Sequence, residues 1–194
     1  AVTRHPGLRV VGMEGSNLSS VDPGLLARMV KKMEEVQMRS LQVTGQQLEA
    51  VMTALCESDS RLKKLAISGN NLSSVDAGLL ARAVNMLEEV GMNHTKLTVE
   101  QGTAIFTAIN QENCKMKQLD ISYNNLSSVD AGLLARALNM LQEVNMVSTQ
   151  LTREQGAAIF IAINQENSKM KKLYISRNNL SSVDAGLLAR ALNR

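Results

Sequence analysis

The sequence SSVDAGLLARA occurs three times in this chain, at residues 73–83, 127–137 and 181–191. A fourth version, SSVDPGLLARM, occupies residues 19–29, so successive copies lie 54 residues apart. A fixed period of this length is typical of stacked structural units and not of one irregular globular domain. The function therefore has to be sought in what differs between the copies.

The chain around these copies alternates two kinds of segment that share one pattern, LxxLxLxxNxL, with apolar residues at positions 1, 4, 6 and 11. LKKLAISGNNL represents the first kind and LEEVGMNHTKL the second. The first kind occupies 8–18, 62–72, 116–126 and 170–180, and the second occupies 33–43, 87–97 and 141–151.

Each segment predicts a short strand followed by a helix. Apolar residues at positions 4 and 6 alternate with variable ones, as in Leu65 and Ile67, which indicates a strand with one buried face. Apolar stripes then predict helices over 73–85 and 98–111. Ser73-x-x-Asp76 and Thr98-x-x-Gln101 have the spacing of a capping box at the start of these helices.

Position 9 carries an amide in the first kind of segment, at Asn70, Asn124 and Asn178. We expect this amide to bond open backbone groups where the strand turns away. Thr95 and Thr149 take its place in the second kind. Leu41 replaces it in the second repeat, which puts the local turn there in doubt.

These seven matches in fixed phase resemble the leucine-rich repeat family over almost the whole chain. Repeat lengths alternate between 25 and 29 residues and each repeat contains a true helix, as in the ribonuclease-inhibitor-like subclass and the repeat domains of NOD-like receptors. The resemblance implies an α/β fold in which residues 1–194 form a single solenoid of about seven repeats. It would be a curved horseshoe with a parallel β-sheet on its concave face and α-helices on its convex face. Residues 1–7 are expected to form a loop or the frayed end of a missing repeat.

Composition argues against several classes of function. The net charge is only +3 with no basic stripe, which argues against a nucleic-acid partner, and no apolar run is long enough to span a membrane. The cysteines, Cys56 and Cys114, lie at non-equivalent repeat positions with no CxxC pair, so we expect free thiols in a reducing compartment, the cytoplasm. Neither His5 nor His94 has a metal-binding spacing and no nucleophile motif is present, so we expect no metal, no cofactor and no enzymatic activity.

Position 3 alternates in charge along consecutive repeats. Glu35, Lys64 and Glu89 form one such series, and Glu143 and Lys172 form another. Neighbouring strands would bring these opposite charges side by side, and cross-strand pairs of this kind stabilise a sheet. We interpret the series as structural pairing and not as a ligand site.

The copies at 65–85, 119–139 and 173–193 differ at only three of their 21 positions. One difference is a core exchange of Val for Leu, and the other two fall at pattern positions 5 and 8. Position 5 must point away from the core because it lies between two buried neighbours. The residues there are Ala66, Asp120 and Tyr174, and those at position 8 are Gly69, Tyr123 and Arg177.

We interpret this variation as diversified recognition, with neutral drift at exposed sites as the alternative. The changes run from small to acidic, aromatic and basic, and Tyr and Arg often dominate binding surfaces. The second kind of segment also varies at these positions, where Gly91 is matched by Asn145 and His94 by Ser148. The candidate binding residues on the concave face are Arg39, His94, Asp120, Tyr123, Asn145, Ser148, Tyr174 and Arg177.

The sequence thus favours a non-enzymatic recognition module whose concave face binds a protein or, as the resemblance to innate immune receptors implies, a small microbial ligand. The alternative is a structural scaffold, an engineered consensus array or a repeat fragment, without a ligand of its own. The degenerate second repeat argues for a natural origin. Because no polar capping repeat is visible after Leu180, Leu188 and Leu192, we also expect weak end-to-end self-association.

Overall fold

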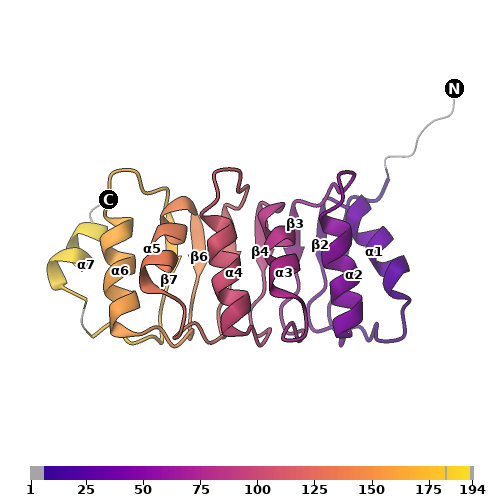
Figure 1. Ribbon diagram of the computed structural model, residues 1–194, viewed down its shortest axis with the longest axis horizontal. Coiled ribbons are helices and arrows are strands. Elements are labelled where there is room, and N and C mark those ends of the chain that lie inside the picture. The colour runs from indigo at the N-terminus through magenta and orange to yellow at the C-terminus, as the bar shows by residue number, and fades with distance from the viewer. Residues whose placement is uncertain (1–6, 182, 193–194) are drawn as a thin grey trace, which may run out of the picture.

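The computed structural model describes residues 7–181 and 183–192, and these form seven strands and seven helices in strict alternation (Figure 1). The expectation for the N-terminal loop falls on residues 1–6 and so lies outside the described residues, apart from Gly7. The strands are β1 (Val10–Gly12), β2 (Glu35–Gln37), β3 (Lys64–Ala66), β4 (Glu89–Gly91), β5 (Gln118–Asp120), β6 (Glu143–Asn145) and β7 (Lys172–Tyr174). The helices are α1 (Pro23–Lys32), α2 (Gly45–Leu55), α3 (Ala77–Asn85), α4 (Val99–Ile109), α5 (Ala131–Met140), α6 (Arg153–Ile163) and α7 (Ala185–Leu192).

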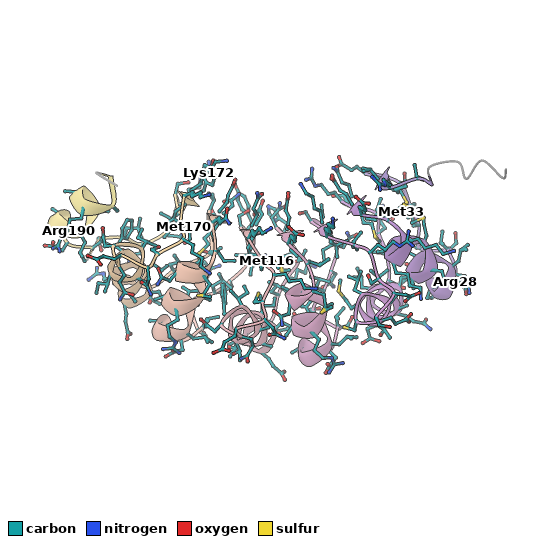
Figure 2. All side chains as sticks on the ribbon, turned by 90° about the horizontal axis from the view of Figure 1, so that it is seen from above. Arg28, Met33, Met116, Met170, Lys172 and Arg190 are labelled. Carbon is teal, nitrogen blue, oxygen red and sulfur yellow. The ribbon has the colours of Figure 1, made fainter. Side chains whose placement is uncertain are left out.

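The strands form one parallel sheet in the order of the sequence, from β1 to β7. The register joins equal pattern positions, for example Val36 to Leu65 and Leu119 to Val144. Seen from above, the helices lie along the outer side of a gentle arc and the strands along its inner side (Figure 2). The predicted solenoid, with its parallel sheet inside and helices outside, is therefore confirmed, and each repeat is numbered below by its strand.

The helices begin with two different caps. Thr44, Thr98 and Thr152 each form a complete capping box with a Gln three residues later, as predicted for Thr98. The prediction for Ser73 was wrong, because α3 begins at Ala77 with Asp76 as its N-cap, and the Asp76 carboxylate accepts from the Leu79 N–H at 2.7 Å. The hydroxyl of Ser73 instead donates to Asn71 in the turn before the helix.

Aliphatic and Met side chains fill the space between sheet and helices, and Phe106 is fully buried among them. Met38, Met92 and Met146 occupy position 6 of repeats two, four and six and are fully buried. These Met residues therefore fill the core and do not form an adaptable binding surface.

The asparagine amides at position 9 connect repeats three, five and seven to the repeat before each of them. Asn124 Oδ1 accepts from the backbone N–H groups of Thr95 and Leu97, and its Nδ2 donates to the carbonyl oxygens of Met92 and Ile121. Asn70 reaches the turn around Leu41 in the same way, which satisfies the backbone there although Leu41 lacks a polar side chain. The amide thus serves the preceding repeat as well as its own turn.

The helix caps supply a second connection between repeats. Gln101 accepts from the Thr98 N–H within its capping box, and its Nε2 donates to the carbonyl oxygens of Leu72 and Val75, both at 2.7 Å. Gln47 and Gln155 make the equivalent bonds. One side chain therefore starts a helix and holds the preceding turn.

The predicted charge pairing occurs at two of the three expected places. Lys64 pairs with Glu89 at 2.9 Å and Lys172 with Glu143 at 3.0 Å. The carboxylate partner raises the pKa of each lysine, chiefly through the hydrogen bond. Glu35 accepts instead from Gln37 Nε2, because its strand neighbour Lys64 turns to Glu89.

We expect Asn124→Ala to lower the free energy of unfolding by about 1–3 kcal/mol, because buried backbone groups of two repeats lose their partner. Asn125→Ala is the matched control, since Asn125 is exposed and bonds only to Ser127 nearby. The control should cost about 0.5 kcal/mol or less. Urea unfolding measures both, and equal costs would contradict the proposed connection between repeats.

The last repeat leaves apolar side chains partly uncovered. Leu126 is 1% and Leu134 0% exposed, whereas their counterparts Leu180 and Leu188 are only half-buried, and the side chain of Leu192 lies outside the description. Self-association of the chain 1–194 through its ends stays a prediction. We expect sedimentation to show weak, concentration-dependent association, and a single monomeric species at millimolar concentration would contradict it.

Candidate functional site

The candidate binding residues project from the face of the sheet that the helices leave open. The middle residue of each strand from β2 to β6 is buried, and its two neighbours point the other way. In Figure 2 the side chain of Lys172 points away from the helix layer in this manner. Every repeat therefore offers positions 3 and 5 on the strand, and position 8 just after it, to a partner.

Position 8 has the same unusual backbone in all seven repeats, a left-handed φ that favours glycine. Only the first and third repeats place glycine there. The residues and their φ angles are Gly15 (71°), Ser40 (53°), Gly69 (73°), His94 (54°), Tyr123 (56°), Ser148 (54°) and Arg177 (59°). Side chains at this position carry a backbone cost of about 1–2 kcal/mol each that glycine avoids.

His94 and Tyr123 stack on one another across neighbouring repeats. Their ring centroids lie 4.4 Å apart with an angle of 9° between the planes. Tyr123 nevertheless keeps 41% of its surface exposed. The stack covers one face of each ring and leaves the rest of both side chains partly exposed, which suits contact with a partner.

Asp120 and Asn145 are neighbours on β5 and β6 and are held by local hydrogen bonds. Asp120 accepts from the Ser122 hydroxyl at 2.7 Å, from the Ser122 N–H, and from Asn93 Nδ2. Asn145 accepts from the Val147 N–H. Both side chains are therefore pre-positioned, which lowers the entropy cost of binding through them.

Tyr174 follows Asn145 in register on β7 and is 49% exposed. Arg177 is exposed three residues further along. Two rows thus run side by side, one at position 5 across repeats five to seven and one at position 8 across repeats four to seven. We call their members the concave patch: His94, Asp120, Tyr123, Asn145, Ser148, Tyr174 and Arg177.

Arg39 is the predicted site residue that lies apart from the concave patch. It projects from repeat two and pairs with Glu14 of repeat one at 3.2 Å. The structure therefore places seven of the eight predicted residues in adjacent repeats and Arg39 two repeats away, although Arg39 lines the same groove as Asp120, Asn145 and Tyr174.

A shallow groove of about 230 Å³ crosses this face from β2 to Tyr174. Its lining includes three small residues that are not among the predicted binding residues, Ala66, Ser68 and Gly91. They lie in register on adjacent strands β3 and β4 or just after them. The sequence could have indicated two of these residues as part of the same face, because Ala66 and Gly91 occupy the same position 5 as Asp120 and Tyr174.

Metal-ligand clusters, membrane-spanning helices and cysteines are the other features of the described part of the chain that bear on function. No three His, Cys, Asp or Glu residues gather there as metal ligands would, and no helix there has the length and apolar character needed to cross a bilayer. Cys56 is an exposed free thiol, and Cys114 is a half-buried one whose pKa is raised by burial.

Comparison with known proteins agrees with this architecture. A family model described as "Leucine Rich repeat" matches residues 112–135, which run from the loop before β5 into α5. Among solved structures, the tropomodulin C-terminal domain of Caenorhabditis elegans is similar, with a TM-score of 0.51 and 14% sequence identity over 89% of this chain and 90% of that one. No curated protein sequence matches the chain. The chain thus has the fold of a leucine-rich repeat solenoid and carries at least one recognisable leucine-rich repeat.

The left-handed backbone at position 8 predicts an unusual response to glycine. We expect Arg177→Gly to leave the free energy of unfolding unchanged or raise it by up to about 1 kcal/mol, because relief of the left-handed backbone offsets the entropy cost of glycine. Arg136→Gly, in the exposed middle of α5, should instead lower it by about 1 kcal/mol. Urea unfolding of both variants measures the difference, and an equal loss in both would contradict this interpretation.

Proposed function

We propose that this chain is a non-catalytic recognition module that binds a protein partner through the concave patch. One observation carries the proposal. His94, Tyr123 and Arg177 occupy left-handed positions at which Gly15 and Gly69 serve the fold without strain. Backbone strain of this kind is typical of sites where a side chain is needed for function, because folding alone gains nothing from it.

The chemistry of the patch suits a protein surface. Tyr174 offers apolar area and a hydroxyl at small entropy cost, and Arg177 offers a planar set of donors. Both tyrosines of the chain, Tyr123 and Tyr174, lie exposed in this patch. Tyr and Arg are enriched among the residues that dominate binding energy, which supports this face as the binding surface.

The shape of the groove favours a protein over a small microbial ligand. Small-molecule sites are enclosed, mostly apolar cavities of about 300–1,000 Å³. This groove is about 230 Å³, shallow, and lined by charged and amide side chains such as Glu35, Lys64 and Asn93. A more specific form of the proposal is a role in innate immunity. It rests on the resemblance of the repeats to those of NOD-like receptors. The free thiols, Cys56 and Cys114, support a cytoplasmic location.

The alternative function is a scaffold without a ligand. It is favoured by the near identity of 65–85, 119–139 and 173–193, which an array built for stability alone would also have. The two proposals differ in a simple way, because a scaffold has no partner that depends on the concave patch.

The test measures the affinity of a partner captured from native extract for single variants of the chain. We expect Tyr174→Ala and Arg177→Ala each to weaken binding by more than about 1 kcal/mol, because both remove interfacial anchors. The melting temperature should stay nearly unchanged, since both side chains are exposed.

Arg82→Ala and Arg136→Ala are the matched controls, because both arginines are exposed on the helical side, on α3 and α5. They should leave affinity unchanged. A partner that binds the variant lacking Asp120, Tyr123, Tyr174 and Arg177 as tightly as the parent chain would place the site elsewhere. Failure to capture any partner would favour the scaffold.

A further inference from the structure

A shallow pocket of about 310 Å³ lies at the edge of the sheet where β5 and β6 begin. Its lining includes the last residues of α4 and α5 and part of the loop 110–117 that leads from α4 into β5. The loops that follow α2, α4 and α6 lie along the upper side of the molecule in Figure 1, and Figure 2 looks down on this edge, with Met116 labelled. None of the lining residues belongs to the concave patch.

The 54-residue period builds an equivalent pocket one double repeat earlier, with a volume of about 350 Å³. The two linings correspond residue by residue, so that Met86 stands in the earlier pocket where Met140 stands in the later one. We call them the Met86 pocket and the Met140 pocket. They can be compared as two variants of one site, and Lys115 lines both.

An exposed methionine gives the later pocket an apolar wall. Met140 is the last residue of α5 and keeps 38% of its surface exposed, whereas Ile109 and Met116, which also line the pocket, are buried. Met140 thus differs from the core methionines, such as Met92, which are fully buried. A flexible, polarisable side chain at the surface can adapt to an apolar group of a partner.

The charge of the Met140 pocket differs from that of the Met86 pocket. Among the described residues, three cationic side chains line each pocket. Two carboxylates, Glu34 and Glu88, line the Met86 pocket, but Glu88 alone lines the Met140 pocket. Gln142 takes the place that Glu88 has in the Met86 pocket. The exchange removes one negative charge and leaves the Met140 pocket the more positive of the two.

The carboxylate that remains at the Met140 pocket is already bonded. Glu88 accepts from Lys117 Nζ at 2.6 Å, and this hydrogen bond lowers the pKa of the Glu88 carboxyl. Lys171, the counterpart of Lys117 in the next double repeat, meets the neutral Gln142 amide instead, at 3.4 Å. The positive charge on this side of the pocket is therefore left uncompensated.

Two further lysines at the Met140 pocket lack a carboxylate partner. Lys115 and Lys169 are exposed and form no ion pair with any described residue. Each can donate a charge-assisted hydrogen bond to a carboxylate from outside the chain. Exposed ion pairs contribute little by themselves, so a ligand of this pocket has to use the apolar wall as well.

We propose that the Met140 pocket binds an acidic segment of a protein partner, which places an aliphatic side chain against Met140 and flanking carboxylates near Lys115 and Lys169. A peptide is favoured over a nucleic acid, because phosphate backbones are bound along basic stripes and these cations surround an apolar wall. The pocket is a second interaction surface, on the edge of the sheet, and it does not depend on the concave patch.

The probe is the peptide acetyl-Glu-Leu-Glu-amide, titrated into the full chain and followed by backbone amide NMR. Acetyl-Gln-Leu-Gln-amide removes the charges, and acetyl-Glu-Ala-Glu-amide removes most of the apolar contact. We expect saturable shifts at Cys114, Lys115 and Met140 with the probe, and binding weaker by about threefold or more with either control.

The two control peptides can each overturn the assignment. If the alanine peptide binds as tightly as the probe, the lysines attract anions without a pocket, and if the glutamine peptide does so, charge has no part in binding. An oligonucleotide of eight thymidines that gives the same shifts at lower concentration than the probe would assign the lysines to phosphate and would also overturn the proposal.

Paired substitutions locate the binding. Met140→Ala should weaken it by about threefold or more, whereas Met86→Ala, at the pocket with two carboxylates, should leave it unchanged. Lys169→Gln should weaken it as well, whereas Lys96→Gln makes the same change of charge in the turn after β4 and should have no effect. All four side chains are exposed, so the fold should persist in each variant. Equal effects within either pair would contradict the location.

Discussion

The buried amide that reaches from one repeat to the turn of the preceding repeat is the interaction on which this structure depends. Each strand has only three residues, so the ladder between strands is short. The turns after the strands would leave backbone groups unbonded in the interior, which is costly. Asn124 and its counterparts bond those groups. Gln101 and its counterparts donate to carbonyl oxygens in the turn that precedes the helix of the preceding repeat. Stacking of repeats is therefore a polar as well as an apolar interaction.

These amides also support the functional face. Asn124 bonds the N–H groups of Thr95 and Leu97, which alternate along the chain with the left-handed residues His94 and Lys96. Strained backbone persists only where the surroundings impose it. The buried amide of repeat five therefore holds the backbone that carries His94 against Tyr123. Exposed side chains at position 8 can vary while the buried framework beneath them stays constant.

Local patterns in the sequence predicted much of the molecule, because they depend on contacts within one repeat. Thr98 and Gln101 form their capping box as predicted, since both partners lie within one helical turn. Ser73 does not, because the Asp76 carboxylate is the stronger cap and starts the helix one turn later. The repeat spacing predicted that Lys64 pairs with a carboxylate on a neighbouring strand. The structure shows that the partner is Glu89 and not Glu35, and this choice depends on side-chain directions, which the repeat spacing does not specify.

The sequence by itself determined the alternation of strands and helices, the inward residues of each repeat and the positions that face outward. It could do so because burial repeats with a fixed period along the chain. Only the tertiary structure decided which groups meet across repeats: the stack of His94 on Tyr123, the separation of Arg39 from the concave patch, and the unbonded hydroxyl of Ser68. These contacts join residues that lie about one repeat or more apart, and they depend on strand register and left-handed backbone geometry, neither of which the pattern of apolar residues specifies.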